Sequence, residues 1–223
     1  MLRFPAKQFD GRLAVWSFAL TGLTIGLPPF LFMKYLSAVI PGQAMAVIIV
    51  LYMVLVTGAL HLDGLADTAD GLFSGRSREK MLEIMKDSRI GTMGAVAIVM
   101  VLITKTACVY AVQNPLWLLI IPAYARYSMV FGVYMFGYAR ETGTAAAFFG
   151  NYSPMVFAQG AFLLAISYFL GPISFAVLNL SFIIYIYTIT RLYKKRIGGI
   201  TGDMLGAMCE TCEAFLLILA VCL

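Results

Sequence analysis

The chain has 223 residues, of which 61% are hydrophobic and 12% are charged, and its formal net charge is +5. Soluble domains are about 45–50% apolar and about 25% charged, so this composition excludes an ordinary soluble domain and a disordered chain. A helix that crosses a bilayer needs about 20 mostly apolar residues. We therefore expect one all-α domain over residues 1–223, a polytopic integral membrane bundle of about 6–7 transmembrane helices.

In chain order, seven apolar segments predict the membrane helices. They cover residues 13–33, 44–62, 92–113, 115–137, 155–170, 172–190 and 203–222. The first segment is long and lacks a cleavage site, so it indicates a membrane helix and not a signal peptide. Pro28 and Pro29 are expected to kink or break it, and the fifth segment is short for a span. The polar stretch 63–91 is the longest piece predicted outside the membrane, on its cytoplasmic side.

Basic residues predict the orientation, because they collect in cytoplasmic loops. With the N-terminus in the cytoplasm, 13 of the 16 basic residues are cytoplasmic and only Lys34 lies in an outer loop. All 11 acidic residues also fall on cytoplasmic loops or on helices entered from that face. We expect a multi-pass protein of the cytoplasmic membrane, with a polar active-site cavity open to the cytoplasm. The positive charge is then an orientation signal, and no nucleic-acid partner is expected.

The first acidic cluster directly follows the second apolar segment. Asp63, Asp67 and Asp70 are spaced i, i+4, i+7, which places them within about 60° of one another around a helix. Carboxylates on one stripe repel one another and need protons or a cation, unless the stripe is only a solvated face. Oxygen ligands of this kind indicate Mg²⁺, Mn²⁺ or Ca²⁺ and not zinc, and Mg²⁺ commonly binds one or two carboxylates together with substrate phosphates. His61 stands at the start of the cluster, as a candidate base or as a structural hydrogen-bonding residue.

A polar group precedes the third apolar segment, and it contains Lys86, Asp87 and Arg89. Phosphate contact together with a metal ligand is a reasonable use for these side chains. The preceding stretch, with apolar Met81 and Met85, indicates an interfacial amphipathic helix.

Two cations are predicted inside membrane helices, Lys105 and Arg126. Each would be costly in lipid without a partner. Two alternatives remain open at this stage: they pair with buried glutamates, or they bind substrate phosphate. Arg140 follows in a predicted cytoplasmic loop and is a further candidate for phosphate contact.

A second acidic cluster lies in the last apolar segment, where Asp203, Glu210 and Glu213 share roughly one helix face. Glu213 would lie about 15 Å along the axis from Asp203, where a carboxylate needs a cavity, a partner charge or a metal. Cys209 and Cys212 form an isolated CxxC, which we interpret as packing residues.

Carboxylates and cations at one face of a membrane bundle suit phosphoryl or diphosphate chemistry, in which metal ions neutralise the diphosphate. The sequence contains no P-loop, GxSxG or HExxH motif. Covalent catalysis therefore has no obvious nucleophile.

Several longer motifs resemble one known family. They are Thr57–Phe73, Met81–Thr92, Leu102–Lys105, Tyr138–Glu141 and Gly198–Ala207, followed by Glu210 and Glu213. These stretches resemble the adenosylcobinamide-GDP ribazoletransferases, also called cobalamin synthases. The resemblance implies a Mg²⁺-dependent transferase for a late step of cobalamin (vitamin B12) synthesis. Such enzymes join α-ribazole or its 5′-phosphate to adenosylcobinamide-GDP and release GMP.

The resemblance and the residue patterns together yield a candidate site. We expect catalytic roles for Asp67, Asp70 and His61, with Asp67 or Asp70 as the base and His61 as the alternative. Substrate contacts are expected from Lys86, Arg89, Lys105 and Arg140. The candidate metal ligands are Asp63, Asp67, Asp70, Asp87, Asp203, Glu210 and Glu213. Membrane lipid is the expected surrounding, and assembly into a homo-oligomer stays open.

Three alternatives and one departure accompany this interpretation. The aspartate motif also resembles that of CDP-alcohol phosphatidyltransferases. An aspartate-rich prenyltransferase and a transporter that binds ions through these carboxylates are the other two alternatives. A transporter needs access from both faces, however, and the outer loops hold one charge. Family members usually open with a longer segment than Leu2–Pro5, so an early segment is expected to be compressed or missing.

Overall fold

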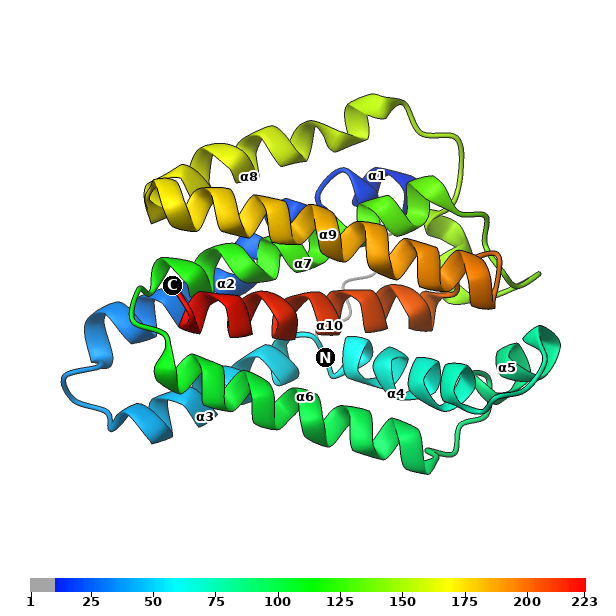
Figure 1. Cartoon of the computed structure of the whole chain (residues 1–223), viewed down its shortest axis with the longest axis horizontal. Helices are drawn as coiled ribbons and strands as arrows, with labels where there is room; N and C mark the ends of the chain where they lie inside the picture. The colour runs from blue at the N-terminus through cyan, green and yellow to red at the C-terminus, as the bar shows by residue number, and fades with distance from the viewer. Residues whose placement is uncertain (1–10) are drawn as a thin grey trace, which may run out of the picture.

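The computed structural model describes residues 11–223 as a bundle of elongated helices lying side by side (Figure 1). Its α-helices are α1 (Gly11–Val15), α2 (Phe18–Leu36), α3 (Gly42–Val56), α4 (Leu60–Phe73), α5 (Arg78–Ile84), α6 (Thr92–Ala111), α7 (Leu116–Met135), α8 (Gln159–Ser167), α9 (Pro172–Arg196) and α10 (Gly202–Val221). Short 3-10 helices cover Thr144–Phe148, Pro154–Ala158 and Tyr168–Leu170. The expectations for Leu2–Pro5 and for the side of the membrane on which Arg3 and Lys7 lie fall outside the described residues.

Five helices are long and apolar enough to cross a membrane: α2, α6, α7, α9 and α10. The helices α3 and α4 pass the same test only together, with a bend of 85° between them, as in a broken span or a re-entrant loop. The predicted fifth segment is helical over Pro154–Leu170 and shorter than these spans. This architecture confirms the predicted all-α, polytopic membrane fold.

The predicted continuous helix over 44–62 is wrong, because the chain turns sharply between α3 and α4. Gly58 and Ala59 both have left-handed backbone conformations, with φ of 60° and 58°. A left-handed residue cannot continue a right-handed helix. Gly58 adopts this conformation without strain, whereas Ala59 carries a Cβ atom and packs against the buried cluster of Leu62, Leu65 and Ala207. The turn starts α4 just before the first acidic cluster.

Of the kink or break predicted at Pro28 and Pro29, the break does not occur, because α2 continues through both prolines. This helix packs very closely against α7. A Cβ atom added at Gly22 would lie 2.4 Å from the Cα atom of Ala123, and one at Gly26 would lie 2.6 Å from the carbonyl oxygen of Leu119. Membrane helices tolerate proline where neighbouring helices enclose the backbone, which is the arrangement here.

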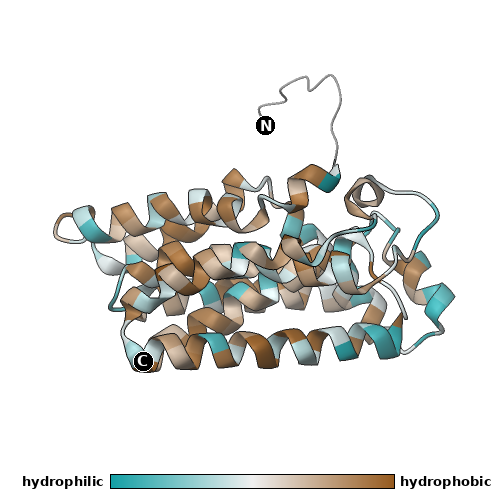
Figure 2. Ribbon diagram, turned by 90° about the horizontal axis from the view of Figure 1, so that it is seen from above, coloured by the Kyte–Doolittle hydropathy of each residue, from teal (hydrophilic) through white to brown (hydrophobic). Residues whose placement is uncertain are grey.

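The helices α7 and α10 form the centre of the bundle, since most of their residues are buried. The outer helices α6 and α9 instead expose large apolar side chains such as Ile103 and Ile183. Figure 2 shows hydrophilic colour gathering at the end of the bundle that carries α5. We call this the polar end; it contains the start of α6, the end of α9 and the start of α10 (Figure 1).

Candidate active site

The two predicted acidic clusters meet where α4 crosses α10. A Cβ atom added at Gly64 would lie 2.6 Å from the backbone oxygen of Asp203, so only glycine allows this approach. One turn further along α10, Gly206 lies against the backbone of His61. These glycines bring the start of α10 beside the acidic face of α4. We define the resulting acidic ridge by its four carboxylates: Asp63, Asp67, Asp70 and Asp203.

Asp67 lies at the centre of the acidic ridge. It is half-buried, and its carboxylate is under electrostatic influence from Asp63, Asp70 and Asp203 and from one cation, Arg140. No hydrogen bond or ion pair within residues 11–223 engages the carboxylate of Asp67 or of Asp63. Four carboxylates facing one guanidinium leave the ridge with an excess of negative charge. Like charges at this spacing favour a bound cation or proton.

Arg140 joins the ridge to the α5–α6 segment. Its guanidinium lies 2.6 Å from the carboxylate of Asp203 and donates a hydrogen bond of 3.2 Å to the carbonyl of Met85. Its Nε is buried and has no partner in the described part of the chain. Arg140 therefore keeps one donor available beside the carboxylates, as a predicted phosphate contact requires.

The position of Arg140 is set by backbone pairing between two loops. The Ala139 amide donates to the carbonyl of Ile200 at 2.9 Å, and the Ile200 amide donates to the carbonyl of Gly137 at 3.2 Å. This pairing joins the motif at 138–141 to the motif at 198–207. The local sequence does not predict this backbone pairing, because the two segments lie about 60 residues apart in the chain.

Asp70 holds the start of α6. Its two carboxylate oxygens accept hydrogen bonds from the backbone amides of Gly91 at 2.7 Å and Gly94 at 2.9 Å. Gly91 is the N-cap of α6 and has no side chain to satisfy those amides, so Asp70 supplies the missing cap from another helix. Sequence reasoning missed both glycines. The sequence signal that could have identified them is a helix that begins at a glycine, whose missing side chain must be replaced by a cap from elsewhere.

The predicted polar group at 86–89 is only partly brought to the ridge. Asp87 and Arg89 form an exposed ion pair of 2.6 Å, and with Asp70 they line a surface hollow of about 390 Å³. Hydrogen bonds from Arg89 lower the pKa of Asp87 to about 2, so this carboxylate is ionised at neutral pH. Lys86 is exposed and does not line the hollow.

The other predicted site residues form a separate, buried charge cluster. Lys105 of α6 lies 2.5 Å from both Glu210 and Glu213 of α10, and Arg126 of α7 pairs with Glu213. Two cations and two carboxylates balance each other inside the bundle. The structure therefore favours the first alternative for Lys105 and Arg126, which is pairing with buried glutamates. It does not bring Glu210 and Glu213 to the acidic ridge.

His61 lies between the ridge and the buried charge cluster. It sits in the first turn of α4 and interacts electrostatically with Arg126, Glu213 and Lys105. Its Nδ1 atom is buried and has no hydrogen-bond partner among the described residues. The structural hydrogen bond expected for His61 is thus not formed by this nitrogen.

The carboxylates differ in their availability for a metal ion. Within residues 11–223, no three His, Cys, Asp or Glu side chains form a ready-made metal site. Glu210, Glu213 and Asp87 are paired with cations, and Asp70 accepts two amides. Asp63 and Asp67 keep all their oxygens available, with Asp203 beside them. These carboxylates outnumber the nearby cations, and carboxylate oxygens are ligands that suit Mg²⁺. The metal site itself stays a prediction.

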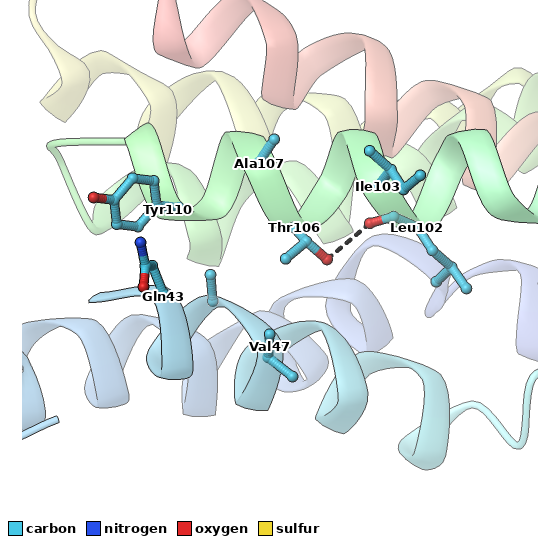
Figure 3. A pocket seen from close by; sticks show the side chains of 8 residues that line it. Gln43, Val47, Leu102, Ile103, Thr106, Ala107 and Tyr110 are labelled. Carbon is cyan, nitrogen blue, oxygen red and sulfur yellow. Dashed lines mark hydrogen bonds between the residues drawn. The ribbon is translucent and has the colours of Figure 1, made fainter. Parts of the chain in front are cut away.

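A second hollow lies away from these charges. Figure 3 shows it between α3 and α6, with Gln43 and Tyr110 toward one end and Leu102 toward the other. Its volume is about 490 Å³, and the Thr106 hydroxyl in it donates to the carbonyl of Leu102. None of its lining residues is charged. It offers nothing to a diphosphate, so the acidic ridge remains the candidate site.

Fold and site define an integral membrane protein whose bundled helices present carboxylates and an arginine at one end. The cobalamin-5-phosphate synthase family matches residues 1–221, and the chain belongs to this family.

Among similar proteins are the adenosylcobinamide-GDP ribazoletransferases of Clostridium botulinum strain Kyoto, Syntrophobacter fumaroxidans and a Thermoanaerobacter species. They are 36%, 39% and 37% identical over 96%, 92% and 90% of this chain, and 88%, 85% and 83% of their own lengths are covered. No solved structure matches the chain. The family assignment confirms the resemblance found in the sequence motifs.

Proposed function

We propose that this protein joins α-ribazole, or its 5′-phosphate, to adenosylcobinamide-GDP with release of GMP, a late step of cobalamin synthesis. Family membership and the names of the relatives support this reaction. The observation that carries it in the structure is the acidic ridge beside Arg140, because diphosphate transfer needs both charge neutralisation and anion contact. The reaction places the protein among phosphoryl-group transferases.

The chemistry is a displacement at phosphorus. A ribose hydroxyl oxygen bonds to the phosphorus attached to the cobinamide side, the bond from that phosphorus to the GMP oxygen breaks, and the hydroxyl proton leaves. Asp67 is the proposed proton acceptor, because it is central and half-buried and its carboxylate forms no hydrogen bond within residues 11–223. Arg140 and Arg89 are the proposed diphosphate contacts. Lys105 is not among the proposed diphosphate contacts, because two glutamates already bind its ammonium group.

A divalent cation, Mg²⁺ or Mn²⁺, would be held by Asp63, Asp67 and Asp203 and would neutralise charge on the diphosphate. We further place the polar end on the cytoplasmic side of the cell membrane. The concentration of basic loops and helix ends at that end supports this orientation.

A donor comparison tests the proposal. Purified protein in nanodiscs is mixed with α-ribazole and adenosylcobinamide-GDP, with Mg²⁺ or with EDTA, and GMP and the new corrinoid are quantified. Parallel reactions contain a CDP-alcohol or a prenyl diphosphate as donor. We expect both products only with adenosylcobinamide-GDP and Mg²⁺. Turnover of another donor in place of adenosylcobinamide-GDP would contradict the proposed donor substrate. Full turnover in EDTA would contradict the proposed dependence on a divalent metal.

A further inference from the structure

A third hollow at the polar end is lined by cations instead of carboxylates. It lies between the ends of α7 and α9, with a volume of about 350 Å³, and its lining includes Met135, Phe136, Tyr187, Arg191 and Lys194. In Figure 1, α9 and α4 lie on opposite sides of α10. The cationic hollow is therefore separate from the acidic ridge.

The charges of this hollow are not neutralised by carboxylates in the described part of the chain. Arg191 and Lys194 are both exposed, and no carboxylate pairs with either within residues 11–223. The sequence contains no acidic residue between Glu141 and Asp203. The guanidinium of Arg191 lies 4.9 Å from the ring centre of Tyr187, which also lines the hollow. The hollow thus presents two cations that attract an anion from outside.

The same face of α9 becomes apolar away from the polar end. Leu180, Ile184, Tyr187, Arg191 and Lys194 follow one another at spacings of three or four residues, so they form one stripe along the helix. Leu180 and Ile184 are 61% and 53% exposed on a helix long enough to span a membrane. An aromatic residue between apolar and cationic positions is typical of a membrane interface. The stripe matches a molecule with an apolar chain and an anionic head.

We propose that this hollow binds the phosphate of one anionic phospholipid, with an acyl chain along Leu180 and Ile184. Arg191 would donate two hydrogen bonds to the phosphate, and Lys194 would add a second charge. A soluble phosphate would use the same two cations and would gain nothing from the apolar part of the stripe. That difference separates a lipid site from a site for a soluble anion.

Retention of lipid after mild detergent extraction tests the proposal. The protein is extracted from nanodiscs of equal parts phosphatidylglycerol and phosphatidylcholine, and bound lipid is counted by native mass spectrometry. We expect preferential retention of phosphatidylglycerol. The double variant Arg191→Gln/Lys194→Gln should lower the retention of phosphatidylglycerol roughly twentyfold. Each of the two cations contributes a similar share of the free energy of binding to an anionic lipid, and the variant loses both shares. The matched control Arg76→Gln/Lys195→Gln loses equal charge from exposed positions of the same end, and we expect parental retention.

Two further arms complete the test. Soluble glycerol 1-phosphate should not displace the lipid, and displacement by it would assign the hollow to a soluble anion and overturn the proposal. Equal retention of both lipids by the parent protein, or unchanged retention by the double variant, would also overturn it. The single variants Arg191→Gln and Lys194→Gln provide the same readout if the double variant is not monodisperse.

Discussion

At the scale of single residues, the ion pairs of Lys105 connect α6 to α10 in the interior of the bundle. Lys105, Glu210, Glu213 and Arg126 are all nearly inaccessible to solvent. A buried pair is weak evidence for net stabilisation, but removal of one partner leaves an uncompensated charge. We therefore expect the stability of the bundle to depend on the balance between the two cations and the two carboxylates of this cluster.

We expect Lys105→Met to destabilise the protein by about 3–5 kcal/mol, because one buried carboxylate then lacks a counter-charge. The double variant Lys105→Met/Glu210→Gln restores neutrality and should recover part of this loss. Thermal unfolding in detergent measures both variants. A double variant no more stable than the single one would show that charge balance is not what the cluster provides.

Asp70 is expected to act on stability through the cap that it gives α6. Asp70→Ala removes the acceptor for the amides of Gly91 and Gly94 and should cost about 1–2 kcal/mol. Asp63→Ala, on the same helix face but exposed and without such bonds, is the control. Both are measured by thermal unfolding in EDTA, so that metal binding does not contribute. Equal melting temperatures for the two variants would contradict the capping role.

At the scale of elements, the crossing of α4 and α10 assembles the site. Gly64 permits the contact that places Asp203 beside Asp63 and Asp67. A side chain at this position must push the helices apart, because the nearest atoms belong to the backbone of Asp203 and not to a flexible side chain. Stability and activity are therefore coupled at this crossing.

Gly64→Ala is expected to destabilise the protein by about 1–3 kcal/mol through overpacking and to lower GMP release. Gly137→Ala is the matched control, since an added Cβ atom there meets nothing within 4 Å. The two variants are compared by thermal unfolding and by initial rates. A wild-type rate of GMP release by Gly64→Ala would show that the reaction does not depend on the close crossing of α4 and α10.

The sequence predicted elements better than their junctions. Helical periodicity placed Asp63, Asp67 and Asp70 on one face, and the structure keeps them there. The same periodicity placed Glu213 on the face of Asp203 but deeper in the bundle, where a partner charge was one of three alternatives. It could not identify that partner, because Lys105 and Arg126 come from other helices. Apolar residues run through the α3–α4 turn, so hydropathy could not reveal a break that depends on two left-handed residues.

At the scale of the whole molecule, the polar end and the C-terminus lie at opposite ends of the bundle (Figure 1). Cys222 is exposed near the C-terminus, whereas Cys209 and Cys212 are buried and Cys108 is partly buried. With the polar end in the cytoplasm, a membrane-impermeant maleimide should label Cys222 on intact cells. Lys80→Cys in a Cys222→Ser background should be labelled only after permeabilisation. The reverse pattern would invert the proposed orientation.

The central claim is that the acidic ridge carries out the transfer reaction, and Asp67 tests it most directly. The measurement is the rate of GMP release from adenosylcobinamide-GDP by Asp67→Asn at saturating Mg²⁺. Glu83→Gln, an exposed carboxylate on α5, is the control. Loss of the base predicts a rate lowered by about 10²–10⁴-fold in Asp67→Asn and parental in Glu83→Gln. A parental rate in correctly folded Asp67→Asn would contradict the account.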